Sequence, residues 1–421
     1  MEQKDTQKKM PFSKRLVLYS LLLFVVFVTV FAVSLLIDTD TTQEDHFQIG
    51  IDFADYYTAG HMAISGELAH VYDVSSHRDA MAQLLGISVP FTLPWRYPPV
   101  FLMAIVPFSL LPFRVSLIAW LVITLALAAL AVYRMLPNRK WLAALLFGFP
   151  GVFMNLRWGQ NGFLSAALLA AGVGALESNP LLGGAMLGLL IFKPQFAVLP
   201  FLILLLTKRW KALGSAIGSA VLASLASIAL FGVTQWVEFF RSLFVSSSNL
   251  LEVERTSIAA IQLSPYNALL NIGVSSPVSW VIQGILSVAA VVAVYWVFTK
   301  TNRAFLRGAA LVLGIPLVIP YFMQYDLMIL AVPVILLAYE FLEKGASKIE
   351  FALLELLFLL PILNWPLVIY TRVQICPLVM IATMILILLR VKRERSQPDL
   401  IAQPIDLNPN NHSIQKETKN G

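Results

Sequence analysis

Residues 16–37 read LVLYSLLLFVVFVTVFAVSLLI, a run of 22 residues that contains no charged side chain. As a helix this run would be about 33 Å long at 1.5 Å per residue, which is enough to cross a bilayer. Basic residues precede it at positions 4, 8, 9, 14 and 15. An acidic polar segment follows it, in place of the small-residue cleavage site that would end a signal peptide. We therefore expect a retained first membrane span, with residues 1–15 in the cytoplasm.

The composition of the whole chain agrees with this expectation. Of its 421 residues, 58% are hydrophobic and only 13% are charged, and the mean hydropathy is +0.77. Soluble proteins carry roughly 25% charged residues. So few charges cannot cover a solvated surface, which excludes a soluble enzyme, a DNA-binding module and a disordered protein. The single Cys376 lies in an apolar run and excludes a disulfide framework. We expect an all-α polytopic membrane protein with no nucleic-acid partner.

The apolar runs predict about twelve transmembrane helices in one domain over residues 16–390. Beyond the first span they lie at approximately 98–112, 114–135, 141–155, 160–176, 180–207, 211–232, 277–298, 304–320, 326–342, 350–369 and 373–390. Basic clusters within 208–211, 300–307, 344–348 and 390–393 would then all be cytoplasmic. Residues 391–421 are expected to form a disordered cytoplasmic tail.

This arrangement leaves one conflict, which concerns the basic residues after the third predicted span. It places Arg134, Arg139 and Lys140 outside, although basic residues favour the cytoplasmic side. Segments that cross only half of the membrane between residues 98 and 176 would also explain these positions.

Two long polar segments are expected on the extracytoplasmic side, residues 38–97 and 233–276. The first contains nine acidic residues but only two arginines and lysines, which favours an outer location. Within it, apolar and aromatic residues recur at helical spacing from Tyr56 to Ala63, and Gly66 follows as a stop signal. This pattern predicts a short helix at the membrane interface.

Carboxylates are scarce elsewhere, because none occurs between residues 80 and 176 or between 256 and 325. An acid or base on the outer side must therefore come from one of the two outer loops or from Asp326. Asp52 and Asp55 have apolar and aromatic neighbours that would hold a carboxylate in a partly dry setting, where its pKa can be tuned. The alternative is that these two acids cap the interfacial helix.

Histidines gather in the same loop but do not have the spacing of a metal site. His46, His61, His70 and His77 are separated by 15, 9 and 7 residues, whereas two ligands on one helix face would be four apart. We expect solvated histidines and no metal.

Three further polar groups interrupt or border apolar runs. Arg96 in PWRYPP can hold a phosphate at headgroup depth, or it snorkels to the interface. Gln160 and Asn161 in RWGQNG offer amides to carbohydrate hydroxyls, unless this segment is a plain cytoplasmic turn. Lys193 lies deep in an apolar run, directly before Pro194. We expect it to act either as a cation that faces a phosphate or as a counter-ion within the bundle.

The motifs resemble those of a known family when they are taken in chain order. They are Gly50-Ile-Asp52-Phe-x-x-Tyr56-Tyr57-x-Ala59, Leu68-x-x-x-Tyr72-Asp73, Tyr97-Pro98-Pro99, Gly159-Gln160-Asn161, and Lys193-Pro194 with Lys208-Arg209-Trp210 after it. This order, over residues 48–212 and more weakly to Asp326, resembles glycosyltransferase family 87. These are integral membrane GT-C enzymes, which include polyprenol-phosphate-mannose-dependent α-mannosyltransferases.

The resemblance implies a multi-pass plasma (inner) membrane enzyme with an extracytoplasmic active site and no cofactor. It would move mannose or another hexose or pentose from a polyprenyl-phosphate donor to a lipid or glycan acceptor, with inversion. Asp52 occupies the position of the catalytic aspartate. The expected ligands of the donor phosphate are Arg96, Lys193 and Arg157. Substrate contacts are expected from Asp55, Tyr56, Tyr57, Tyr97, Gln160, Asn161, Gln324 and Asp326.

The scarcity of carboxylates is compatible with this chemistry. A glycosidase needs two carboxylates because the leaving alcohol must be protonated. A polyprenyl phosphate leaves as a stable anion, so one general base is sufficient. A transporter or flippase of lipid-linked sugars is the main alternative, although the chain shows no internal repeat. A polymerase of lipid-linked glycans is a third possibility.

Overall fold

The computed structural model describes residues 10–37, 49–86, 95–245 and 261–396, and the regular elements in these ranges are all helices. An isolated antiparallel bridge joins Gln262 to Met323. The all-α expectation is therefore confirmed. Some of the predicted features lie outside the described residues. They are His46, the acidic residues at positions 38–45, 252 and 254, and the tail from residue 397.

Helices of two lengths make up the membrane-embedded body. Among the described residues, six are long and apolar enough to cross a membrane: α1 (Phe12–Ile37), α5 (Phe113–Met135), α11 (Trp210–Phe231), α15 (Ser276–Lys300), η4 (Gln324–Leu330) continuous with α17 (Ala331–Lys344), and α18 (Lys348–Thr371). Shorter apolar helices are α4 (Pro99–Ser109), α8 (Gly162–Ala175), α9 (Pro180–Gly188) with η3 (Leu189–Phe192), α10 (Pro194–Leu206) and α16 (Ala304–Val318). The multi-pass character is confirmed, but the count of about twelve spans is not.

The remaining elements connect and cover these helices. They are α2 (Ile51–Ile64), η1 (Leu68–His70), α3 (Val74–Leu85), η2 (Lys140–Ala143), α6 (Ala144–Gly148), α7 (Gly151–Trp158), α12 (Val233–Val245), α14 (Pro265–Asn271) and α19 (Cys376–Ser396). The helix predicted around Tyr56 is α2, and Gly66 follows it with φ +88°. α19 continues past residue 390, where the sequence pattern placed the end of the domain.

Ion pairs gather at one end of the bundle, which we call the basic end. Arg139 Nε lies 2.7 Å from Glu343 Oε1, and Arg209 and Arg307 each place a nitrogen 2.9 Å from Glu177 Oε1. The basic end thus comprises residues 134–140, 177–179, 207–211, 298–307, 340–350 and 390–396. Arg139 lies beside Glu343 and hence at the same end as residues 344–348, so the expected arrangement that separated them is wrong.

The short helix α4 explains how this comes about. It has 11 residues, so it rises only about 16 Å at 1.5 Å per residue. Pro107 lies inside it and Pro112 follows, and the chain turns back beside α2, where the Tyr57 hydroxyl donates to the Leu111 carbonyl oxygen at 2.8 Å. α5 starts from this turn and ends at the basic end. The short helix fits the half-crossing alternative, which removes the conflict over Arg139.

Residues 180–207, predicted as one span, instead form a helical hairpin with Lys193 at its tip. α9 runs parallel to α11, because Gly184 lies beside Ala212 and Gly188 beside Ala216. α10 then returns to the basic end. The helix breaks here because Pro194 cannot donate a backbone hydrogen bond to continue η3. Each limb has 13 residues or about 20 Å, which is shorter than the ~30 Å hydrocarbon layer.

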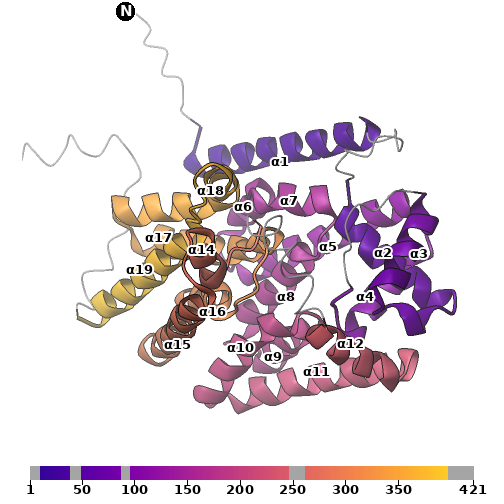
Figure 1. Ribbon diagram of the computed structural model, residues 1–421. Coiled ribbons are helices and arrows are strands. Elements are labelled where there is room, and N and C mark those ends of the chain that lie inside the picture. Colours follow the sequence, from indigo (N-terminus) through magenta and orange to yellow (C-terminus); the bar gives the residue numbers. More distant parts are fainter. Residues whose placement is uncertain (1–9, 38–48, 87–94, 246–260, 397–421) are drawn as a thin grey trace, which may run out of the picture.

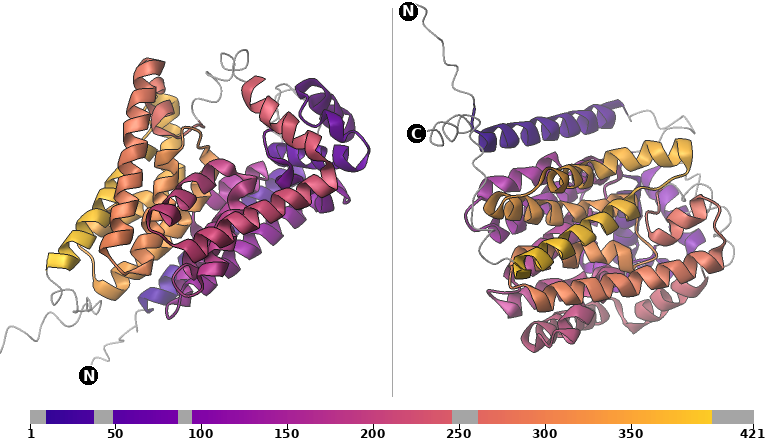
Figure 2. Two further views of the ribbon diagram at one scale, coloured as in Figure 1. Left: turned by 90° about the horizontal axis from the view of Figure 1, so that it is seen from below. Right: turned by 90° about the vertical axis from the view of Figure 1, so that its left-hand side faces the viewer.

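The helices divide into groups that follow the chain (Figure 1). α2, α3 and α4 lie on one side, α15 to α19 on the other, and α5 to α10 between them (Figures 1 and 2). α1 runs along α6 and α7 on the outside, with ring centroids 5.1 Å apart for Phe24 and Phe147. The central helices therefore bring their polar breaks next to α2, far from the basic end.

Candidate active site

Asp52 lies in the first turn of α2, which is not one of the candidate spans. Gly50 begins this helix in the left-handed conformation (φ +74°) and no side chain caps it, so the capping role considered for Asp52 is wrong. The Asp52 carboxylate is partly buried, and its Oδ2 accepts a hydrogen bond from Gln160 Nε2 at 2.8 Å. A residue 108 positions away thus holds the carboxylate in place.

The Gln160 amide comes from the break between α7 and α8. Gly159 has φ +71°, and a Cβ there would lie 2.5 Å from Phe53 Cβ on α2, so only glycine permits this close approach. The Gly50 amide donates to the Arg157 carbonyl oxygen at 2.8 Å, which fixes the break against the start of α2. The break therefore packs against the start of α2 and lies away from the basic end.

Two phenols extend the polar network from Gln160. The Tyr56 hydroxyl donates to Gln160 Oε1 and accepts from Asn161 Nδ2 at 3.0 Å. The Tyr56 and Tyr97 hydroxyls lie 2.9 Å apart, and Tyr72 holds Tyr97 by donating to its carbonyl oxygen at 2.8 Å. Burial raises the pKa of Tyr56 and Tyr97 well above the ordinary value, so both phenols stay protonated and can donate.

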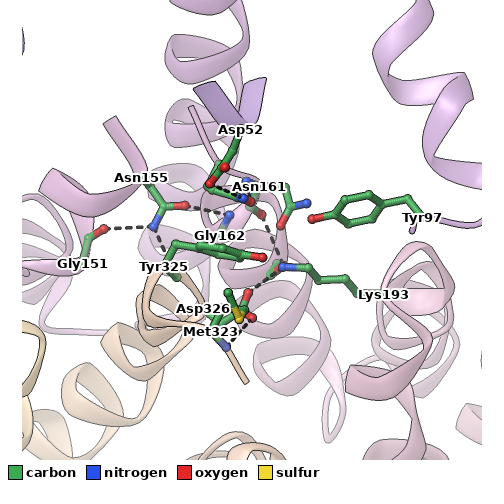
Figure 3. Close-up of polar contacts among 12 residues, drawn as sticks. Asp52, Tyr97, Gly151, Asn155, Asn161, Gly162, Lys193, Met323, Tyr325 and Asp326 are labelled. Carbon is green, nitrogen blue, oxygen red and sulfur yellow. Dashed lines mark hydrogen bonds and ion pairs between the residues drawn. The ribbon is translucent and has the colours of Figure 1, made fainter. Parts of the chain in front are cut away.

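A buried ion pair lies next to this network (Figure 3). Lys193 Nζ lies 2.5 Å from Asp326 Oδ1, and the two side chains are 3% and 1% exposed. Asp326 Oδ2 also accepts from the Met323 amide at 3.1 Å, and Lys193 Nζ lies 4.9 Å from the centre of the Tyr325 ring. The pair joins the hairpin tip to the start of η4. This ion pair agrees with the expected role of Lys193 as a counter-ion within the bundle. Asp326 accepts one of the three ammonium hydrogens, which leaves two for other acceptors.

Asn155 was missed by the sequence analysis, although it is an amide inside the apolar run of α7. Its Nδ2 donates to the carbonyl oxygens of Gly151 at 2.9 Å and Tyr325 at 3.0 Å, and its Oδ1 accepts from the Gly162 amide at 2.8 Å (Figure 3). Asn155 therefore ties the break that carries Gln160 to the segment that carries Asp326.

The electrostatic surroundings of Asp52 shift its proton equilibrium. Burial raises the pKa of Asp52 to about 7, opposed by the hydrogen bond from Gln160 and the charge of Lys193, while the nearby Asp55 adds to the rise. A carboxylate that titrates near neutrality can accept a proton at physiological pH and is only weakly solvated.

Several predicted site residues lie around this network rather than within it. The Tyr57 hydroxyl is bonded to Leu111 instead, and the Arg157 guanidinium lies 5.7 Å from the Trp158 ring. Arg96 is partly buried and precedes Tyr97 in the chain. Gln324 is buried, and its backbone N–H donates to the Ile261 carbonyl oxygen at 2.8 Å.

Asp55 and His77 form a pair of their own, with His77 Nε2 2.8 Å from Asp55 Oδ1. The expectation of a solvated His77 is wrong, because its side chain is fully buried between α2 and α3. His61 is half-buried and His70 is exposed. Within the described residues, no group of three or more histidines, cysteines and carboxylates could hold a metal ion.

The sequence matches the family described as glycosyltransferase family 87 over residues 95–320, more than half of the chain. The chain therefore belongs to glycosyltransferase family 87 and is a membrane glycosyltransferase, not a transporter. No curated protein and no solved structure matches it. The matched region contains Tyr97, Gln160, Asn161 and Lys193, and the contacts described above connect these residues to Asp52 and Asp326 outside it.

Proposed function

We propose that this glycosyltransferase moves a sugar, mannose or another hexose or pentose, from a polyprenyl-phosphate donor to a lipid or glycan acceptor, with Asp52 as the general base. The observation that carries the proposal is the partly accessible Asp52 carboxylate, which Gln160 orients by a hydrogen bond and whose pKa burial raises to about 7. In the proposed step Asp52 takes the proton of the acceptor hydroxyl.

The rest of the proposed step follows from the chemistry of the donor. As the proton leaves, the acceptor oxygen forms a bond to the anomeric carbon from the face opposite the phosphate. The bond between that carbon and the phosphate oxygen breaks, and the polyprenyl phosphate departs with the electron pair. The configuration inverts, and the leaving group needs no proton because it is a stable anion.

Cations and neutral donors near Asp52 suit the charge that develops on the phosphate. Lys193 retains two free ammonium hydrogens, and Arg96 precedes Tyr97 at the entrance to α4. The second amide hydrogen of Asn161 can donate to sugar hydroxyls or phosphate oxygens. The Tyr97 hydroxyl donates its proton to Tyr56, so its oxygen can accept from a sugar hydroxyl. Donors arranged in advance around developing charge are a major source of rate enhancement.

We place the active site on the extracytoplasmic side of the plasma membrane. The support is the distribution of charge, since the positive residues gather at the basic end and α2 lies at the other. A lipid-linked donor fits this side, because the phosphate would lie at headgroup depth and the polyprenyl chain in the bilayer.

The donor class is tested with purified full-length protein in detergent. The protein is incubated with radiolabelled polyprenyl-phosphate mannose or with the corresponding nucleotide-activated sugar, and a total membrane lipid extract supplies the acceptor. We expect label in a new product only from the lipid-phosphate donor, and none with the D52N variant. Transfer from the nucleotide sugar alone would contradict the proposal.

A further inference from the structure

Asp55 and His77 form a buried carboxylate–imidazole pair that the proposed reaction does not use directly. His77 Nε2 lies 2.8 Å from Asp55 Oδ1, and the side chains are 0% and 8% exposed. Asp55 lies on α2 and His77 on α3, the helix that covers α2 from outside. Both side chains are buried, so the pair is poorly accessible to a substrate.

The position of Asp55 links this pair to the proposed base. Asp52 and Asp55 are three residues apart on one helix, so their side chains lie on the same face about 5–6 Å apart at Cβ. Two carboxylates at this separation in a poorly solvated place disfavour each other's ionised form. A partner that compensates the negative charge of Asp55 therefore also makes Asp52 easier to ionise.

Other charged groups around α2 do not take this role. The elements packed against α2 carry His70 on η1, Arg78 and Asp79 on α3 beside His77, Arg114 and Arg134 on α5, and Arg157 on α7, whereas α4 carries no titratable group. Arg78 and Asp79 are exposed and pair with each other. The groups that act on Asp52 from other elements are Lys193 and Gln160. Lys193 is already paired with Asp326, and Asp55 contacts His77.

We propose that His77 is a positioning residue for Asp52: by pairing with Asp55, it compensates the neighbouring carboxylate so that Asp52 can release its proton and serve as a base. This inference rests on the proposed function of Asp52. It gives α3 a role in the reaction although α3 does not contact the polar network.

The test measures the ionisation of Asp52 without any substrate. Thermal unfolding is followed from about pH 5 to 9 for the protein with and without D52N, in the parental, H77F, H77Q and D55N backgrounds. Asp52 is harder to ionise in the folded than in the unfolded state, so the stability gained by D52N grows as pH rises and levels off above the folded pKa. The rise levels off at the midpoint of Asp52 ionisation in the folded protein, and this midpoint is compared between the backgrounds.

We expect the midpoint to move in opposite directions in the two key variants. In H77F the negative charge of Asp55 has no partner, so the two carboxylates retain a proton to higher pH. The midpoint should therefore rise by on the order of one pH unit. In D55N the negative charge is gone, so the midpoint moves lower by a similar amount. H77Q can still donate a hydrogen bond to Asp55 and should recover part of the shift.

The double variant D55N/H77F separates tuning from a merely structural role. If His77 acts through Asp55, the double variant should have the midpoint of D55N alone. An unmoved midpoint in D55N, or a shift from H77F that persists in the D55N background, would overturn the proposal. D55N and the double variant decide the question even if H77F does not fold. Full sugar transfer by D52N would instead refute the function proposed for Asp52, which is a separate outcome.

Discussion

At the scale of single residues, the site depends on a carboxylate that is accessible and yet poorly solvated. Asp52 is partly exposed, makes one side-chain hydrogen bond to Gln160 and titrates at about 7. An ordinary exposed aspartate would be a weaker base, because its pKa lies near 4. Basicity here comes from burial near the interface, opposed in part by Lys193.

This proton equilibrium predicts the pH dependence of the reaction. Because a base must be ionised, kcat/KM should rise with pH and level off above about 7, the pKa of Asp52. The measurement is the initial rate of transfer from polyprenyl-phosphate mannose at low donor concentration across this range. A rate that falls as pH increases through 7 would show that the reaction needs a protonated group instead.

Lys193 offers a second prediction, which separates its two possible roles. K193A alone leaves Asp326 buried without its partner, which costs roughly 3–5 kcal/mol and can unfold the protein. The double variant K193A/D326N removes both charges and should fold. If Lys193 also binds the donor phosphate, the double variant should still use the donor about ten- to a hundredfold less well, since such a bond is worth roughly 1.5–3 kcal/mol.

The matched comparison for Lys193 is D326N by itself. D326N keeps the ammonium but leaves it buried without its partner, so this variant should be destabilised as K193A is, while its folded fraction retains donor use. Restoration of parental donor use in K193A/D326N would assign Lys193 to the counter-ion role alone.

Arg96 carries a separate prediction. R96A is expected to weaken donor use by about ten- to a hundredfold, measured in the same assay.

At the scale of elements, the helical hairpin at 180–206 depends on glycines that allow close contact with α11. A Cβ at Gly188 would lie 2.1 Å from the Ala216 carbonyl oxygen, which is backbone and cannot move aside easily. G188A should therefore destabilise the protein by roughly 1–3 kcal/mol and displace Lys193. The control is G218A on α11, where nothing lies within 4 Å, and which should be neutral or slightly stabilising.

Both glycine variants are compared by thermal unfolding in detergent and by donor use. An unfolding temperature of G188A equal to that of G218A would contradict the close packing of the hairpin.

Some elements could be predicted from the sequence because their signals are local. The first span needs only an unbroken apolar run, and α2 needs only helical spacing followed by a glycine. The hairpin could not be predicted, because hydropathy gives the length of an apolar run but not its direction. Lys193-Pro194 marked the break, yet only the contact between Glu177 and Arg209 shows that the chain returns to the end from which it came.

The site was predictable in part for the same reason. Asp52, Gln160, Asn161 and Lys193 were each conspicuous as polar residues among apolar ones. Their contacts join positions more than a hundred residues apart, and no spacing rule encodes such pairs. His77 was mistaken for a solvated residue because its partner Asp55 faces it from another helix.

At the scale of the whole molecule, short helices α4 and α9 to α10 enter the bundle without crossing it. Together with the break before α8 and the start of η4, they bring polar segments to one depth beside α2. Irregular backbone at membrane depth is tolerated where protein buries it. The basic end, in contrast, is closed by ion pairs that join long helices to one another and to a connecting segment.

This arrangement predicts the topology that accessibility labelling should reveal. With Cys376 replaced by serine, single cysteines are introduced by N138C and K344C at the basic end and by S75C on α3. A membrane-impermeant thiol reagent should label S75C in intact cells, and N138C and K344C only after lysis. Labelling of N138C together with S75C would contradict the half-crossing of α4.

The most direct test of the central claim is the transfer rate of D52N, measured with polyprenyl-phosphate mannose and lipid acceptor. Asparagine is nearly isosteric and removes only the base, so folding should persist while turnover falls by roughly 10²–10⁴-fold. D79N is the matched control, because Asp79 is exposed on α3 in the same loop and should transfer at the parental rate. Near-parental transfer by D52N, with transfer abolished in D326N, would show that the base is Asp326 and not Asp52.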